Sequence, residues 1–335
     1  MPVVSIGDMS QHFLSLRNSG VIKTDLARLG QELATGKVTD IAAHLGGDTR
    51  QVSGIDHSLS VLSAFQTTAN ETGLLLENMQ FALDNVSTQS SSTAEVLLKV
   101  SPQSSEHQIS QAGTVARQAF TDIVQSFNGR FGGKSMFAGT AVHTKPLASA
   151  EEMLTNIRAE LVGAATAQDV SSAVQQWFND PAGGFATMGY QGGTGSGRVK
   201  QVGPNQNITI STRADDQLVK DLLASTAIAA LAAEMGGNLT TSDQGDLQRA
   251  SGAELLSGSA GLAEIMGVIG IQQGFLATQK AQFSAEQVSL EMAYNDLTLA
   301  DPFETATRLQ AVQAQLETHF AITARLSNLS LAEYI

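Results

Sequence analysis

The sequence of 335 residues contains no cysteine, a single tryptophan and only 5% aromatic residues. The lack of cysteine excludes thiol catalysis and cysteine-ligated metal sites, and it is compatible with either a reducing or an oxidising compartment. Because no apolar run reaches about 18 residues, we expect no membrane span. Residues 1–10 show neither a basic segment nor an apolar core, so we also expect no cleaved signal peptide.

Basic residues are scarce as well. The chain has 19 Lys and Arg against 32 Asp and Glu, which gives a formal net charge of −13 and a pI near 4.8. An acidic surface argues against nucleic acid or anionic lipid as the main partner. The 42% of hydrophobic residues is ample for a buried core, and the length suggests two or three domains.

Large apolar residues recur at every seventh position of the stretch 255–297. They are Leu255, Leu262, Ile269, Leu276, Phe283, Leu290 and Leu297. Seven residues make two helical turns, so these side chains form one seam along a single long helix. A helix cannot bury such a seam against itself, so the pattern predicts a partner helix of similar length.

The stretch 50–99 is the predicted partner. Steps of seven give Ile55, Leu62, Ala69, Leu76 and Leu83, and the positions three residues later give Ser58, Phe65, Thr72, Met79 and Val86. A third, shorter run reads Ile109, Ala116 and Ile123. We therefore predict a helical bundle whose core includes Leu76, Leu83, Leu262, Ile269, Leu276, Phe283 and Leu290.

Both ends of the chain carry a further apolar stripe. Near the start, helical spacing connects Ile22, Leu26, Leu29 and Leu33, and Gly36 is well placed to end that helix in the left-handed conformation. Near the end, Asp301, Pro302 and Glu304 form a helix start. The stripe that follows includes Leu309, Leu316, Leu326 and Leu329. We expect the two ends to pair as a separate coiled coil.

The pattern changes between the helical halves. The glycine pair within 130–140 predicts a tight β-hairpin, and residues 149–152 form a capping box that starts a helix. Strand-like pieces follow at 185–190, 198–202 and 207–211, before a helix at 215–235. The middle of the chain therefore reads as a small mixed α/β region.

The fold class that we predict is mainly α. Long antiparallel helices from both chain ends form a coiled-coil rod or bundle, and a small mixed α/β domain is inserted between them. The predicted domains are a terminal one (1–45 with 301–335), a long-helix bundle with the β-hairpin (46–138 with 236–300) and an outer domain (139–235).

Candidates for chemistry are few. The glycine-rich stretch 192–197 lacks the Lys and the following helix of a phosphate-binding loop, so a flexible loop is favoured. The only cluster of possible catalytic groups is His44 with Asp40 and Asp48, in a predicted loop. No metal-ligand spacing, nucleophile elbow or Ser–His–Asp motif is present. We predict a protein that is not an enzyme, with no catalytic residues, no cofactor and no metal.

Segments at both ends of the chain resemble the flagellin family. Residues 300–310 and 324–335, the latter reading ARLSNLSLAEYI, resemble the family's C-terminal region. Residues 127–140, which include the sequence MFAGT, are similar to the hairpin that follows the family's N-terminal helices. Residues 29–37 resemble its L-x-x-L-x-T/S-G stretch.

The resemblance implies a structural subunit of the bacterial flagellum, in an extracellular location. Family members are exported unfolded through the flagellar type III apparatus without a cleaved signal, and an export chaperone holds their apolar C-terminal segment. Their terminal helices fold into a coiled coil on assembly. The resemblance therefore implies an assembly interface formed by the two terminal stripes, with Ile22, Leu26, Leu29, Leu33, Leu309, Leu316, Leu326 and Leu329. The implied partners are flagellin, a second hook-associated junction protein and further copies of the chain in a ring or helical assembly.

Two family members and two other classes stay open. Residues 329–335 look closer to the junction subunit between hook and filament than to filament flagellin, and residues 1–7 and 38–44 depart from the filament pattern. The alternative within the family is filament flagellin itself. Outside the family, the alternatives are a helical scaffold or adhesin-like binding module that works through 139–235, and an enzyme that uses the His44 cluster.

Overall fold

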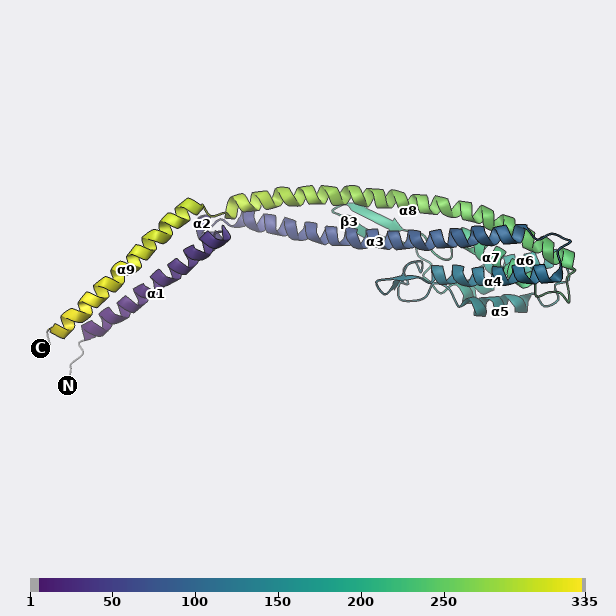
Figure 1. The fold of residues 1–335 in the computed structure, drawn as a ribbon, viewed down its shortest axis with the longest axis horizontal. Helices are drawn as coiled ribbons and strands as arrows, with labels where there is room; N and C mark the ends of the chain where they lie inside the picture. The colour runs from purple at the N-terminus through teal and green to yellow at the C-terminus, as the bar shows by residue number, and fades with distance from the viewer. Residues whose placement is uncertain (1–5, 333–335) are drawn as a thin grey trace. The chain divides into compact units, whose positions relative to one another are not determined.

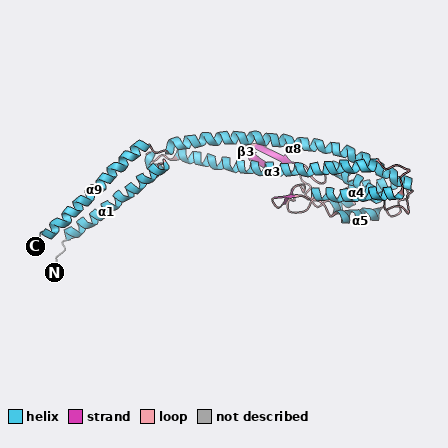
Figure 2. Ribbon diagram, viewed as in Figure 1, coloured by secondary structure: helices cyan, strands magenta, loops and turns pink. Residues whose placement is uncertain are grey.

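The computed structural model of the chain describes residues 6–332 and is 72% helical. Figure 2 shows long helices and, in the described part, only short strands. This confirms the predicted fold class, which is mainly α with a small strand-containing region. The chain divides into two compact units, Met1–Ser63 with Ser284–Ile335 and Ala64–Phe283.

The first unit pairs the two ends of the chain. Helix α1 (Ile6–Thr35) and helix α9 (Pro302–Ala332) lie side by side (Figure 1). The short helix α2 (Ile41–His44) follows α1, in a stretch that was predicted to be a loop. Helix α1 also begins earlier than the apolar stripe suggested, at Ile6.

The long helices α3 (Arg50–Leu98) and α8 (Thr241–Thr298) supply the apolar seam of the second unit. Within that unit the Phe65 and Phe283 rings stack with their centroids 6.2 Å apart. A Cβ on Gly252 would lie 3.0 Å from the Cβ of Leu97, so the two helices approach closely at that level. The two long helices with heptad spacing therefore pack against each other, as the sequence predicts.

Helix α4 (Glu106–Phe127) buries one apolar face. The capping box of Ser105 and Gln108 starts it. Helix α7 (Gln217–Ala232) packs along α4, and α5 (Ala150–Glu160) and α6 (Ala167–Asn179) complete this part of the core. At Gly113 a Cβ would overlap the Cβ of Ala233, so glycine lets α4 come close to the end of α7.

Two hairpins supply the four named strands of the described chain. In the first, β1 (Arg130–Phe131) pairs with β2 (Lys134–Ser135), and both turn glycines, Gly132 and Gly133, have positive φ. Such a two-residue turn suits the twist of a hairpin, and the prediction for 130–140 is confirmed. The second hairpin pairs β3 (Arg198–Gly203) with β4 (Gln206–Ile210), where strands were also predicted.

The prediction of a strand at 185–190 is wrong. Residues Phe185–Gly189 form a short π-helix instead, labelled η1. The ring of Phe185 contacts the rings of Trp177, Phe178 and Tyr190, and the turn that precedes it packs on Trp177 through Gly184. A short apolar run does not distinguish a strand from a buried helical turn, and here the aromatic cluster decides the conformation.

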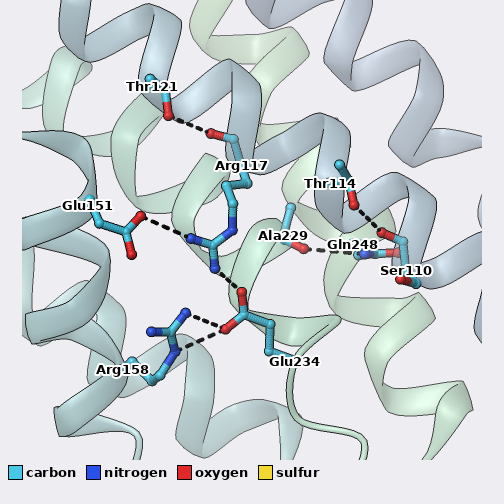
Figure 3. A network of polar contacts seen from close by, with 9 residues as sticks. All are labelled: Ser110, Thr114, Arg117, Thr121, Glu151, Arg158, Ala229, Glu234 and Gln248. Carbon is cyan, nitrogen blue, oxygen red and sulfur yellow. Dashed lines mark hydrogen bonds and ion pairs between the residues drawn. The ribbon is translucent and has the colours of Figure 1, made fainter.

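Polar contacts tie the smaller helices to one another (Figure 3). Arg117 of α4 pairs with Glu151 at 3.4 Å and with Glu234, and Arg158 Nε donates to Glu234 at 2.9 Å. The buried Gln248 of α8 donates to the carbonyls of Ile109 at 2.9 Å and Ala229 at 3.2 Å. The ion pairs are partly solvent-exposed and contribute little to stability, whereas the buried amide satisfies two buried carbonyls.

The boundaries of the three predicted domains do not coincide with those of the two units. Residues of α7, which fall in the predicted outer domain 139–235, share one continuous core with α3, α4 and α8. The three-part division stays a prediction about independent folding, which limited proteolysis tests.

One helix among the described residues, α8, is long and apolar enough to cross a membrane by length and composition alone. Its most apolar 18-residue window has a mean hydropathy of 1.4, and 22% of that window is buried within the chain. Core helices of soluble proteins pass the same test, so this single helix is weak evidence for a membrane span.

Candidate assembly surface at the chain ends

The segment that follows α1 and the segment that precedes α9 are hydrogen-bonded to each other. The Ala300 N–H donates to the Gly36 carbonyl at 3.0 Å, and the Val38 N–H donates to the Thr298 carbonyl at 2.9 Å. These bonds make an isolated antiparallel bridge between Lys37 and Leu299. The end of α1 and the start of α9 are thereby held beside each other.

A buried carboxylate supports this connection. Glu32, in the last turns of α1, is 5% exposed. Its Oε1 accepts from the Thr39 N–H at 3.0 Å and from Arg28 Nη1 at 3.1 Å. A buried carboxylate requires such partners, so Glu32 fixes the path of the chain as it leaves α1. The sequence reading missed Glu32, because an acidic residue beside a leucine stripe looks like a solvated position.

The predicted start of α9 is confirmed. The Asp301 carboxylate accepts from the N–H groups of Phe303 at 2.8 Å and Glu304 at 3.1 Å, and Pro302 is the first helical residue. Glu304 pairs with Arg308 at 2.5 Å. The predicted end of α1 is also as expected, since Gly36 has a φ of 67°.

The predicted interface residues have different degrees of burial. Ile22 and Leu29 of α1 are buried. Leu26 of α1 and Leu309 and Leu316 of α9 are half-buried. Leu33 is 42% exposed, in the turn where Glu32 points inward. The side chains of Leu326 and Leu329 lie outside the described residues. Their role as an assembly interface stays a prediction.

The α1/α9 pair leaves many large apolar side chains in solvent. They are exposed by between 42% and 84%: Phe13, Leu14, Leu16, Val21, Leu33, Phe303, Phe320 and Ile322. Exposed apolar surface of this kind marks an interaction site. The predicted N-terminal stripe includes Leu33 but not the N-terminal half of α1, where the apolar residues are adjacent rather than spaced along one face.

A polar contact lies between the two helices. Ser15 Oγ is 3.4 Å from His319 Nε2 and 3.4 Å from Thr323 Oγ1. About two turns later in α1, Lys23 Nζ lies 5.8 Å from the centre of the Phe320 ring. A polar layer in an apolar helix pair fixes which residues face each other, at some cost in stability.

The possible catalytic cluster of Asp40, His44 and Asp48 lies around α2, where the two aspartates make structural contacts. A cavity of about 400 Å³ beside the connection is lined by Asp40 and His44. The Asp40 carboxylate caps α2 by accepting from the Ala43 N–H at 2.9 Å. Asp48 binds Arg50 at 2.8 Å, and this hydrogen bond lowers the pKa of the Asp48 carboxyl. Among the described residues, no group of three His, Asp or Glu side chains is placed to hold a metal ion.

The predicted core residues lie as follows. Leu76, Leu83, Leu262, Ile269, Leu276 and Phe283 are buried, and Leu290 is half-buried. The glycine-rich stretch 192–197 packs against the segment that follows the first hairpin, with the Gly193 N–H donating to the Ala138 carbonyl at 3.0 Å. The strand β3 follows it, so the loop lacks the helix N-terminus of a phosphate site.

Two solved structures show what this architecture is similar to. A flagellar hook-associated protein from Vibrio parahaemolyticus superposes with a TM-score of 0.51 at 14% identity, over 73% of this chain and 95% of that one. FlgL of Bacillus cereus superposes with a TM-score of 0.51 at 15% identity, over 71% of this chain and 96% of that one. No protein-family model and no curated protein matches the sequence.

The chain therefore has the fold of flagellar hook-associated proteins. FlgL is hook-associated protein 3, so the structural likeness agrees with the flagellin-family resemblance of the sequence. At this low identity the comparison establishes the fold, and the role of the chain has to be argued from its surface.

Proposed function

We propose that this protein is a structural subunit of the bacterial flagellum that assembles through α1 and α9. The observation that carries the proposal is the pairing of the two chain ends into helices whose outer faces remain apolar. Phe303 is 84% exposed and Phe13 is 65% exposed in the single chain. Neighbouring subunits that bury these side chains supply the stabilisation that a two-helix pair lacks by itself.

The position that we propose within the flagellum is the junction between hook and filament, as hook-associated protein 3. The C-terminal residues 329–335 and the fold likeness to FlgL support this position. The partners are then flagellin on one side, the other hook-associated junction protein on the other, and further copies of the chain within the ring or helix. The location is extracellular, after export without a cleaved signal and with the help of an export chaperone.

The experiment that tests this proposal is labelling of isolated flagella with an antibody against the protein. A short labelled zone at the hook tip is expected. Label along the whole filament instead supports filament flagellin, the alternative within the family. A flagellum without label overturns both and leaves the helical scaffold or adhesin-like module as the remaining candidate.

Deletion of residues 139–235 does not separate these candidates. That segment contains α7, whose side chains from Val219 to Ala232 are largely buried against α4 and α6. Removing it opens the core of the second unit, so both a flagellar subunit and a binding module lose function. Localisation is the more informative measurement.

A further inference from the structure

Two stretches of the chain, 123–150 and 181–214, contain no acidic residue. Together they carry six of the 19 Lys and Arg and none of the 32 Asp and Glu. At the average density of the chain, stretches of this length would hold about six acidic residues. The remaining residues carry 13 basic and 32 acidic side chains, so charge is strongly segregated along the chain.

The structure joins the two acid-free stretches into one lobe of the second unit. The Gln191 N–H donates to the Pro146 carbonyl at 2.8 Å, and Arg198 Nη2 donates to the Met136 carbonyl at 2.7 Å. An isolated antiparallel bridge connects Leu147 with Tyr190. We call residues 123–150 and 181–214 the basic lobe.

Three cations of the basic lobe are available to a partner. Arg130, Lys134 and Lys145 are exposed, and none of them forms an ion pair with another described residue. Lys145 contributes slightly to lowering the pKa of Glu152, after the hydrogen bonds from Ser149. A positive surface whose cations form no ion pairs of their own attracts an acidic partner.

The other cations of the lobe are less available. Arg213 pairs with Asp215 at 2.8 Å, directly beside Asp216. Arg198 is half-buried, and burial lowers its pKa. Lys200 of β3 is half-buried and forms no ion pair with another described residue. The fully exposed positive charge is therefore concentrated on the first hairpin and on the loop that ends at Lys145.

The same chain carries an acidic counterpart on α3. Within residues 64–98, helix α3 has four acidic residues and no Lys or Arg. Glu77, Asp84 and Glu95 are separated by 7 and 11 residues, which places them within about 20° of one another around the helix axis. All three are exposed, and none pairs with a basic side chain among the described residues. We call them the acidic stripe.

We propose that the basic lobe of one copy docks on the acidic stripe of a second copy. The lobe and the stripe consist of different residues of the same chain, and their exposed charges are opposite and form no ion pairs within the described chain. Each copy can therefore bind one neighbour with its lobe and another with its stripe. Such a contact is heterologous, and its repetition gives a ring or a helix. The proposal rests on the proposed function only in that the occupant is another subunit, and it names the surfaces that meet.

The direct test is cross-linking of the full-length protein with a carbodiimide, which joins a lysine amine to a carboxylate without a spacer. Equal amounts of unlabelled and ¹⁵N-labelled protein are mixed, so that mass spectrometry separates links between copies from links within one copy. Links between copies from Lys134 or Lys145 to Glu77, Asp84 or Glu95 are expected. Their yield should fall at least about tenfold between about 0.05 M and 0.5 M salt. Links confined to single copies, or none, overturn the proposal.

Charge reversal adds a second test. A lobe variant combines Arg130→Glu, Lys134→Glu and Lys145→Glu, and a stripe variant combines Glu77→Lys, Asp84→Lys and Glu95→Lys. Each variant alone should lose self-association in sedimentation, and a mixture of the two should regain it, since the reversed lobe now matches the reversed stripe. Glu71→Lys is the matched control, because Glu71 is exposed on α3 but lies away from the stripe. If the mixture stays monomeric, the two surfaces do not meet.

Two further outcomes separate this proposal from others. Retention of the protein on a heparin column, with no links between copies, identifies an anionic polymer as the occupant and overturns docking between copies. Labelling of flagella tests the proposed function independently of the interface. Links between copies in a protein absent from flagella leave the interface standing, whereas hook-tip labelling without such links removes the interface and leaves the function.

Discussion

Gly36 and Ala300 are 264 positions apart in the sequence, and a single backbone hydrogen bond of 3.0 Å joins them. Gly36 ends α1 in the left-handed conformation, and Ala300 stands two residues before α9 begins. The bond therefore lies where both terminal helices leave the rest of their unit. Any strain at Gly36 should be felt in the pairing of α1 with α9.

Replacement of Gly36 by alanine should loosen the terminal helices. A Cβ at Gly36 has open space, so the cost comes from the positive φ of 67° alone, about 1–2 kcal/mol. Gly20→Ala is the matched control, because Gly20 also has open space but lies in a regular helix, where alanine is favoured by about 0.5–1 kcal/mol. Hydrogen exchange of α1 amides should quicken in the first variant and slow in the second. Equal exchange in both variants contradicts the role given to Gly36.

The seam between α3 and α8 should respond strongly to truncation. Leu76 is 0% exposed and Leu276 is 1% exposed, so Leu→Ala at either position should lower the free energy of unfolding by about 2–5 kcal/mol. Leu74→Ala is the control on the same helix, since Leu74 is 50% exposed and should cost far less. Urea denaturation followed by circular dichroism measures all three. A loss at Leu74 as large as that at Leu76 means that the seam is assigned to the wrong face.

Heptad spacing predicted most of the helical fold because a sustained repeat of seven is specific for long paired helices. The seam from Leu255 to Phe283 and the run from Ile109 to Ile123 are buried as that pattern implies. Local capping chemistry was equally informative at Ser149, which starts α5 with a capping box. Each of these signals depends on residues that are neighbours in the sequence.

The remaining features depend on contacts between distant residues. Phe185 takes a π-helical conformation because Trp177 and Tyr190 surround it, and no local pattern encodes that. Glu32 is buried only because Thr39 and Arg28 bring donors to it. Charge segregation, by contrast, is visible in the sequence as two acid-free stretches, but only the structure shows that they form one lobe.

Tyr190 should make the protein sensitive to high pH. Burial, followed by the nearby charge of Asp215, raises the pKa of Tyr190 to about 12. The unfolded chain loses this proton near pH 10, so between about pH 10 and 12 it binds fewer protons than the folded chain and stability falls as pH rises. Tyr190→Phe should remove this part of the decline in urea midpoints measured across that range.

The same tyrosine can be followed by absorbance near 295 nm. The chain has three tyrosines, and one tyrosinate should form only at about pH 12 in the wild type. That step should be missing in the Tyr190→Phe variant. If the titration curves of the two proteins differ by a group that ionises near pH 10, Tyr190 is in contact with solvent and the burial argument fails.

Replacement of Leu316 by aspartate should separate assembly from folding. Leu316 is half-buried on α9 in the first compact unit, whereas the seam residue Leu276 lies in the second. A charge at Leu316 is costly once neighbouring subunits exclude water from it, but the second unit is untouched. The main thermal transition of the purified protein should therefore hardly move, while incorporation at the hook tip should fail and cells should release unpolymerised flagellin.

Two control variants accompany this test. Gln315→Asp adds the same charge at an exposed neighbouring position and should assemble normally, and Leu276→Asp should unfold the protein. Calorimetry and a flagellin assay of the culture medium provide the two measurements. Normal motility of the Leu316 variant, or a thermal destabilisation as large as that of Leu276→Asp, contradicts the assignment of this face to assembly.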